Sequence, residues 1–171
     1  MKYARFIYNV PISYSSVNLI NELYLYKSGD ECTSVTGGWI FTAGWGNTSE
    51  EQTSISRQSE YIQFTLYGSF MTGRKGGIGT NNYVDLRDFT HISIEYEQSG
   101  SYRYSNNGLF LIYTPSDGSS STEITLERAT VSRKIKTLTL PTLATPDVRI
   151  RLVEMENVTS VVKIYNVWLH Y

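Results

Sequence analysis

Apolar and polar residues alternate at every second position in segment after segment of this chain, and that period constrains the fold more than any other feature. The alternation is clearest where Ile92, Ile94 and Tyr96 are separated by Ser93 and Glu95. A period of two places successive side chains on opposite faces of a β-strand, whereas a helical pattern would repeat every 3.6 residues. Polar or glycine-rich turns separate the alternating segments, and long helical periods are almost missing. The sequence therefore predicts an all-β fold.

The alternating segments add up to about nine to eleven strands, which favours an antiparallel β-sandwich with jelly-roll topology. The run 109–113 (LFLIY) has no polar face and predicts a central strand that is covered on both sides. The apolar parity changes between Ile135 and Leu138, and this change predicts a β-bulge or a bend there because side chains alternate strictly along a regular strand.

A second parity change lies in the last strand, near Tyr165 and Asn166. A bulge at this point would turn Trp168 away from the face that holds Val167 and Leu169. We also expect this last strand to pair with the sheet that residues 25 and 26 open. If both expectations hold, the two ends of the domain stabilise each other.

The length of 171 residues fits one domain with a full two-layer core. We predict an N-terminal arm over residues 1–22 and a jelly-roll domain over residues 23–171. In the arm, Phe6, Tyr8 and Val10 form a short alternating segment. These three residues are predicted to contact either the domain itself or a neighbouring subunit of an oligomer.

Charge and cysteine content exclude several classes of partner. The net charge of −1 and the pI of about 6.1 argue against nucleic acid, whose recognition relies on many Lys and Arg at the phosphates. Cys32 is the single cysteine, so no internal disulfide can form and a reducing compartment is expected. Arg5 and Asn9 interrupt the apolar core that a signal peptide needs, and we expect no membrane span.

Candidate catalytic groups have simpler explanations. Glu95 and Glu97 would face the same side of a strand about 7 Å apart, a separation that glycosidases use. The solvent face of any antiparallel strand produces the same pair. The two histidines, His91 and His170, lack neighbours with zinc-ligand spacing. We therefore predict no catalytic residue and no enzyme activity.

Aromatic residues point to binding. The chain has 14 tyrosines and three tryptophans, and several lie beside Asn, Arg or Gly in segments without strand pattern. Aromatic rings stack on the C–H faces of sugars, yet Tyr, Trp and Arg are also enriched at protein interfaces, so both partners stay open. The rings could equally cap the ends of the sandwich. The predicted glycan- or partner-binding residues are Trp45, Tyr102, Arg103, Tyr104, Asn106 and Asn107.

Three stretches carry a resemblance to known proteins: 25–39 with its Gly29-Asp30 turn and Gly37-Gly38 pair, 84–96, and 162–169. Together they resemble the jelly-roll domains in tail and baseplate proteins of phages that infect Gram-positive bacteria, and the resemblance covers residues 23–171. It implies a non-enzymatic virion protein, assembled in the host cytoplasm, whose tail, baseplate or fibre-tip module binds a host cell-surface glycan. It also implies other virion proteins as partners and a homo-oligomer, with a trimer favoured.

The same resemblance extends to carbohydrate-binding jelly rolls, which often hold a structural calcium ion. Asp30 and Glu31 beside Gly29 offer hard oxygen ligands for such an ion, and no other cofactor is expected. Two alternative functions stay open. One is a structural virion subunit, such as a capsid decoration or tail accessory protein, whose arm and loops bind other virion proteins. A glycan depolymerase is the weaker alternative.

Overall fold

The computed structural model describes residues 22–28, 39–43, 53–66, 74–80, 82–100, 108–156 and 160–171. These residues form twelve strands and no helix. The strands are β1 (Glu22–Tyr26), β2 (Trp39–Ala43), β3 (Thr53–Arg57), β4 (Ile62–Leu66), β5 (Arg74–Thr80), β6 (Val84–Asp85), β7 (His91–Ser99), β8 (Gly108–Pro115), β9 (Thr122–Glu127), β10 (Val131–Thr139), β11 (Asp147–Glu156) and β12 (Ser160–His170). The predicted count was nine to eleven, and β6 has only two residues.

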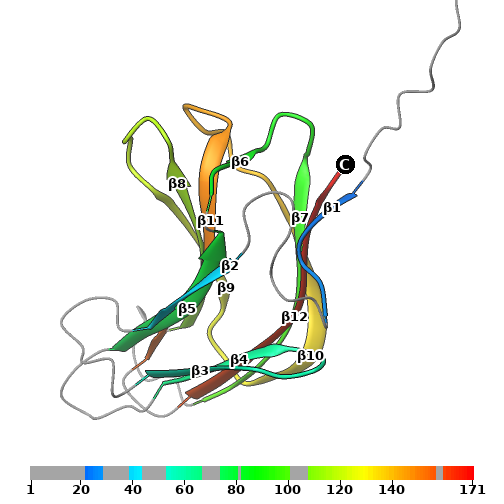
Figure 1. Ribbon diagram of the computed structural model, residues 1–171, viewed down its shortest axis with the longest axis vertical. Helices are drawn as coiled ribbons and strands as arrows, with labels where there is room; N and C mark the ends of the chain where they lie inside the picture. The colour runs from blue at the N-terminus through cyan, green and yellow to red at the C-terminus, as the bar shows by residue number, and fades with distance from the viewer. Residues whose placement is uncertain are drawn as a thin grey trace, which may run out of the picture.

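The strands form two six-stranded antiparallel sheets that face each other (Figure 1). Sheet A has the order β10-β7-β12-β4-β3, with β1 also paired to β12. Sheet B has the order β2-β5-β11-β8-β9, with β6 also paired to β11. The predicted all-β jelly-roll sandwich is confirmed. β1 lies in sheet A and β2 in sheet B, so the glycine-containing stretch at residues 27–38 joins the two layers.

One long strand organises each sheet. In sheet A, β12 pairs with β7 along most of its length, while its other edge pairs first with β4 and then with β1. In sheet B, β11 likewise pairs with β8 on one edge and with β6 and then β5 on the other. In each sheet two short strands thus share one edge of a long strand, and β12 bends on its way from β4 to β1 and the C-terminus (Figure 1).

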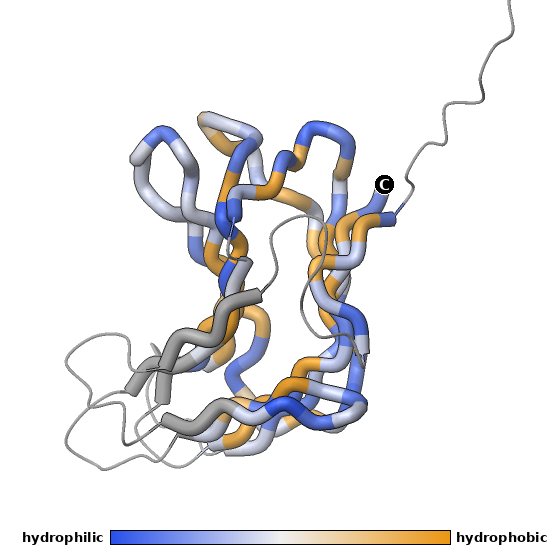
Figure 2. Tube along the Cα trace, in the orientation of Figure 1, coloured by the Kyte–Doolittle hydropathy of each residue, from blue (hydrophilic) through white to orange (hydrophobic). Residues whose placement is uncertain are grey.

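The core fills the space between the sheets, and apolar residues of the strands line it (Figure 2). Its largest fully buried side chains include Tyr26, Tyr96, Tyr113 and Phe64. β8 contributes to the core from one face and is buried on the other as well, where Phe110, Ile112 and Val153 form a second cluster on sheet B. The prediction of a strand covered on both sides is thereby confirmed for residues 109–113.

The two predicted bulges have different outcomes. In β12 the register shifts between Ile164 and Asn166, as predicted. In β10 the shift lies between Val131 and Lys134, so the predicted bulge between residues 135 and 138 is wrong. The physical reason is that Ile135 lies on the outer face of sheet A with 58% of its surface exposed. A single exposed isoleucine is ordinary on a protein surface. Here it gave the sequence an apolar residue on the solvent face, which is the same pattern that a bulge would produce.

The last strand lies in the sheet that residues 25 and 26 open, as predicted, and there it pairs directly with β1. Tyr24 lies opposite Trp168, and Tyr26 lies opposite Val167. Within the described residues, no helix is long and apolar enough to span a lipid bilayer. β1 begins at Glu22, and the predicted arm lies outside the described residues apart from that position.

Candidate functional site

None of the residues predicted from the sequence to bind a ligand, a partner or a metal falls within the described part of the chain. The positions outside it are Trp45, Tyr102, Arg103, Tyr104, Asn106 and Asn107 for glycan or partner contact, Phe6, Tyr8 and Val10 for oligomer contact, and Asp30 and Glu31 for calcium. These assignments stay predictions. The structure instead brings together a different set of side chains on the outer face of sheet A, the face turned away from the core.

Strand alternation decides which side chains reach this outer face. On β7, Ile92, Ile94 and Tyr96 are in the core, so the odd-numbered residues 91–99 point outward. We name two neighbouring groups. The aromatic ladder consists of Tyr24, His91, Trp168 and His170. The polar cluster consists of Tyr61, Glu95, Glu97, Arg133, Lys163, Tyr165 and Asn166.

The aromatic ladder runs from Tyr24 on β1 across to Trp168 on β12, along β12 to His170, and then across to His91 on β7. Ring centroids are 5.8 Å apart from Tyr24 to Trp168, 6.3 Å from Trp168 to His170, and 5.5 Å from His170 to His91. All three pairs are stacked, so much of each ring face is used within the ladder. Such cross-strand aromatic pairs stabilise a sheet. We therefore assign the ladder a mainly structural role.

The β12 bulge builds the centre of the polar cluster. It inserts Tyr165 between Ile164, which pairs with Tyr96, and Asn166, which pairs with Glu95. Tyr165 and Asn166 can then both bond to β7, because the Tyr165 hydroxyl donates to Glu97 Oε2 at 3.1 Å and the Asn166 amide donates to Glu95 Oε2 at 2.5 Å. Two consecutive residues of a regular strand would point to opposite faces.

Cations complete the cluster from neighbouring strands. Arg133 on β10 donates from Nε to Glu95 Oε1 at 2.7 Å, and Lys163 donates to Glu97 Oε1 at 2.9 Å. The Arg133 guanidinium also lies 3.9 Å from the centre of the Tyr165 ring. Tyr165 in turn meets the Tyr61 ring edge to face, with centroids 5.4 Å apart. The result is a network of hydrogen-bonding groups above two tyrosine rings.

Both carboxyl groups of the cluster are held in their ionised form. Hydrogen bonding from Lys163 lowers the pKa of Glu97 despite some burial. For Glu95 burial favours the neutral acid, but the hydrogen bonds from Arg133 and Asn166 outweigh it and the pKa is also lowered. The pKa of Lys163 is raised by its bond to Glu97. Glu95 and Glu97 thus act as hydrogen-bond acceptors, and neither is kept protonated as a glycosidase acid would need to be.

A pocket adjoins the polar cluster where β10 leaves its regular register. We call it the bulge pocket; its volume is about 460 Å³, within the usual range for small-ligand sites. It is lined by Glu97, Gln98, Ser99, Thr130, Val131, Ser132 and Arg133. Glu97 and Arg133 belong to both the pocket and the cluster. The predicted binding residues 102–107 follow Ser99 closely in the sequence.

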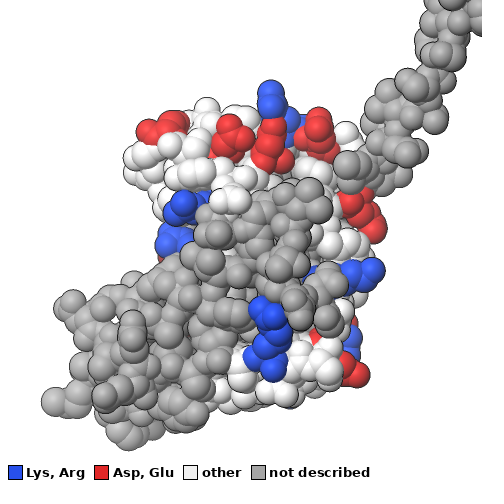
Figure 3. Space-filling view, in the orientation of Figure 1, with Lys and Arg blue, Asp and Glu red and all other residues white. Residues whose placement is uncertain are grey.

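A second pocket, the end pocket, lies at the end of the sandwich that carries the β6–β7 and β10–β11 turns. Its volume is about 520 Å³. It is lined by Leu86, Arg87, Phe89, Thr90, Thr139, Leu140, Pro141, Leu143, Thr145 and Pro146. Charged side chains gather on the same end of the molecule, at the upper edge of Figure 3.

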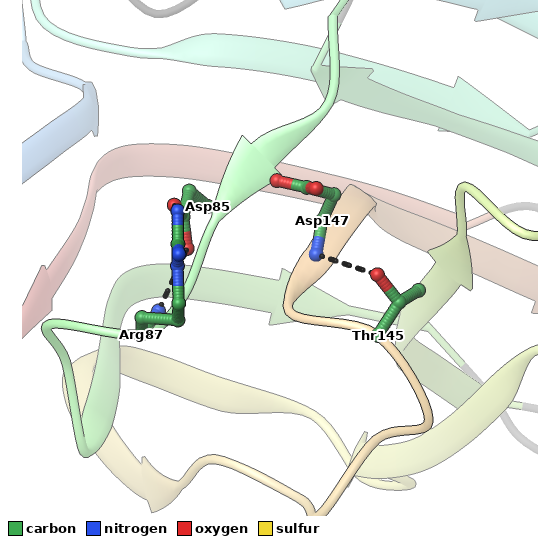
Figure 4. Close-up of polar contacts among 4 residues, drawn as sticks. All are labelled: Asp85, Arg87, Thr145 and Asp147. Carbon is green, nitrogen blue, oxygen red and sulfur yellow. Dashed lines mark hydrogen bonds and ion pairs between the residues drawn. The ribbon is translucent and has the colours of Figure 1, made fainter.

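Figure 4 shows the charged side chains of Asp85, Arg87 and Asp147 together with Thr145; Arg87 and Thr145 line the end pocket. Arg87 folds back on Asp85 and donates from Nε to both carboxylate oxygens, at 3.0 and 2.9 Å. Asp147 lies opposite Asp85 on β11, and its backbone N–H bonds to the Thr145 hydroxyl at 3.4 Å. The bond from Arg87 lowers the pKa of Asp85. Among the described residues, no group of three or more His, Cys, Asp or Glu side chains is arranged to hold a metal ion.

Sequence reasoning missed the polar cluster because its members come from four separate segments. It did identify Glu95 and Glu97 as neighbours on one face, and it placed the β12 bulge correctly. The contributions of Tyr61 and Arg133 depend on which strands are neighbours, and no local pattern carries that information. The pair Glu95 and Glu97 and the parity change at residues 165 and 166 were the two signals that could have drawn attention to this site.

The sequence of the chain matches no protein-family model and no curated protein. The fold is similar to several solved carbohydrate-binding modules. A family 29 module has a TM-score of 0.57 at 11% identity, with 86% of each chain covered. A substituted family 29 module complexed with cellulohexaose has a TM-score of 0.57 at 12% identity, covering 86% of this chain and 89% of that one. A family 11 module from Clostridium thermocellum, in complex with a β-1,3-1,4-mixed-linked tetrasaccharide, has a TM-score of 0.53 at 18% identity, covering 87% and 95%. At identities this low the likeness shows the jelly-roll fold alone.

Proposed function

We propose that the protein binds a neutral glycan on the outer face of sheet A, at the polar cluster and the bulge pocket. The observation that carries the proposal is the network in which Glu95 and Glu97 are bonded by Arg133 and Lys163 above the Tyr165 ring, beside a pocket of about 460 Å³. The carbohydrate-binding modules with a similar fold support the ligand class.

The chemistry of the cluster suits sugar hydroxyl groups. A hydroxyl both donates and accepts, so a carboxylate and a neighbouring cation can bind two adjacent hydroxyls of one ring. Glu95 and Glu97 are offset by Arg133 and Lys163, so the charges of the cluster balance. Because the charges of the cluster cancel, an anionic polysaccharide would gain little electrostatic attraction at this site. A neutral polysaccharide needs no such attraction and can bind through hydrogen bonds. We therefore favour neutral sugars.

The test is isothermal titration calorimetry of the full chain with neutral oligosaccharides, beginning with cellohexaose and the mixed-linked tetrasaccharide, after a glycan array. We expect Lys163→Ala and Arg133→Ala each to weaken binding about tenfold, which corresponds to about 1.4 kcal/mol. Arg149→Ala is the matched control, because Arg149 is exposed on sheet B and stacks on Tyr83 at 4.9 Å. Failure to bind any glycan, or equal affinity in all three variants, would contradict the proposal.

The predicted binding loop can be tested in the same titration. Tyr102 and Tyr104 are close in sequence to Ser99, which lines the bulge pocket. The substitutions to test are Tyr102→Ala and Tyr104→Ala. We expect each to weaken binding if the loop and the cluster form one site. Unchanged affinity in both variants would restrict the site to the described strands.

We further propose a virion setting, supported by the sequence resemblance to phage tail and baseplate jelly rolls. In this setting the protein is a trimeric tail, baseplate or fibre-tip module. A structural role in the capsid or tail is the alternative. Mass spectrometry of purified heads and tails would distinguish these locations, and light scattering would measure the oligomer. Release of reducing sugars from host polysaccharide would contradict the non-enzymatic assignment and favour a depolymerase.

A further inference from the structure

The end pocket is lined mainly by apolar side chains; its one charged lining residue among those described is Arg87, and Asp85, Asp88 and Asp147, which we call the acidic rim, lie near that arginine. Its apolar lining comes from the turn after β6 and the turn between β10 and β11, namely Leu86, Phe89, Leu140, Pro141, Leu143 and Pro146. A mainly apolar pocket of this size is a candidate site for a ligand or for another part of a protein. The question is which occupant fits both the apolar lining and the charge of the rim.

Acidic residues outnumber basic ones at this end of the sandwich. In the segments 85–90, 116–121 and 139–149, the exposed charged side chains are those of Asp85, Asp88, Asp117, Asp147, Arg87 and Arg149. Arg87 is already paired with Asp85. Figure 3 shows the resulting row of acidic groups along the upper edge of the molecule. An occupant with positive charge would therefore be attracted to this rim.

The chain enters the described fold beside this pocket. Glu22 pairs with His170, the Thr90 N–H donates to the His170 carbonyl at 3.0 Å, and the Leu140 N–H donates to the Thr90 carbonyl at 2.8 Å. Thr90 and Leu140 both line the pocket. Thr90 lies two inter-strand spacings from Glu22 and Leu140 lies three, so the pocket begins about 10 Å from Glu22 and reaches Leu140 at about 15 Å.

The sequence before Glu22 complements this pocket in two ways. Residues 1–21 contain Lys2 and Arg5 and no acidic residue, so they carry the charge opposite to that of the rim. They also contain the alternating apolar residues of the predicted arm, from Phe6 to Ile12. An extended segment of this kind presents one row of apolar side chains to a groove.

We propose that residues 1–21 dock into the end pocket of their own chain, with the apolar residues between Phe6 and Ile12 in the pocket and Lys2 and Arg5 at the acidic rim. Residues 13–21 are long enough to make the connection, since nine extended residues span about 30 Å and about 15 Å is needed. Docking within one chain is favoured over docking between chains because a short tether gives an effective concentration of the order of millimolar. This docking would cover the pocket and leave the outer face of sheet A free.

The test is photo-crosslinking of the full chain with p-benzoylphenylalanine in place of Phe6. We expect crosslinks within a single chain to residues 86–90 or 139–146, located by peptide mass spectrometry. Asp88→Lys combined with Asp147→Lys should lower the crosslink yield about fivefold, as expected for the loss of a few exposed charge interactions. Glu60→Lys is the control, because it reverses an exposed charge at the β3–β4 turn, outside this rim.

Salt gives the same test without altering the rim, since about 0.5 M NaCl screens exposed charges and should also lower the yield. Melting curves of the variants show that each is folded. A crosslinked dimer would mean that the pocket takes the arm of a second copy, and this would overturn docking within one chain. Crosslinks to other regions, or a yield that neither the rim variant nor salt changes, would overturn the proposal as well.

Discussion

The outer faces of the two sheets differ sharply, although both sheets are built around one long central strand. On sheet A the outward side chains of β7 and β12, apart from Val161, are polar, charged or aromatic, and several bond to one another. On sheet B, Phe110, Ile112 and Val153 point away from the core and are nevertheless buried. The comparison shows that the outer face of sheet A carries a network of polar and charged side chains, whereas part of the outer face of sheet B is a buried apolar cluster.

The cations on the two outer faces also have different surroundings. A Cβ atom on Gly79 would lie 2.7 Å from the Arg151 Cγ atom, so the arginine side chain lies across the glycine strand. Burial lowers the pKa of Arg151, whose guanidinium donates to the Thr114 hydroxyl at 2.8 Å. On sheet A the corresponding cations, Arg133 and Lys163, have raised pKa values because they are paired with carboxylates.

The strongest test of the contrast places the same substitution on both outer faces. Val153→Asp puts a charge in the buried cluster of sheet B and should lower the free energy of unfolding by about 4 kcal/mol. Val161→Asp is its matched control on β12 of sheet A, where the side chain is half-buried, and should cost about 1 kcal/mol or less. Urea unfolding measures both. Equal losses of unfolding free energy would show that the two outer faces do not differ in how strongly they bury an apolar side chain.

The next effect concerns the close approach of β5 and β11. A Cβ atom on Gly77 would lie 2.0 Å from the Leu152 carbonyl oxygen and 2.9 Å from the Val153 Cα atom. Gly77→Ala should therefore separate the strands and cost about 3 kcal/mol. Gly118→Ala is the control, because nothing lies within 4 Å of the added atom and only its positive φ of 79° costs energy, about 1 kcal/mol. A melting temperature for Gly77→Ala at or above that of the control would contradict the close approach.

A smaller loss is expected in the aromatic ladder on sheet A. Trp168 is half-buried and stacks on Tyr24 with 5.8 Å between centroids. Trp168→Ala should cost about 2 kcal/mol, below the 3 to 5 typical of a fully buried aromatic residue. The loss should affect the whole domain, since β1 and β12 close one sheet. Trp168→Phe should recover much of it; an unchanged melting curve for Trp168→Ala would mean that the terminal strand is peripheral.

The smallest effect is the dependence of stability on pH. The folded pKa values of Glu95 and Glu97 lie below the ordinary value of 4.5. Their contribution is therefore complete above about pH 4.5 and is lost as the pH falls through the lowered values. Glu97→Gln should reduce the loss of unfolding free energy between about pH 5 and about pH 3. If the variant and the wild type lose the same amount, the ion pair with Lys163 contributes nothing measurable.

Much of the fold followed from local pattern. The two-residue period predicted the strands, the unbroken apolar run predicted the doubly covered β8, and the parity change near Tyr165 predicted the β12 bulge. The same reasoning was wrong for Ile135, because an apolar residue on a solvent face gives the same signal as a bulge. The loop residues predicted to bind a ligand lie outside the described residues and remain predictions.

By itself the sequence determined which residues form strands and which face of each strand is apolar, since alternation is a property of neighbouring residues. The tertiary structure alone decided which strands lie next to each other. Only that choice brings Tyr61 and Arg133 to Glu95 and Glu97, and only it sets Glu22 in the same row as the end pocket. The physical reason is that strand partners are selected by long-range hydrogen bonding and core packing between segments tens of residues apart, and no local period records that selection.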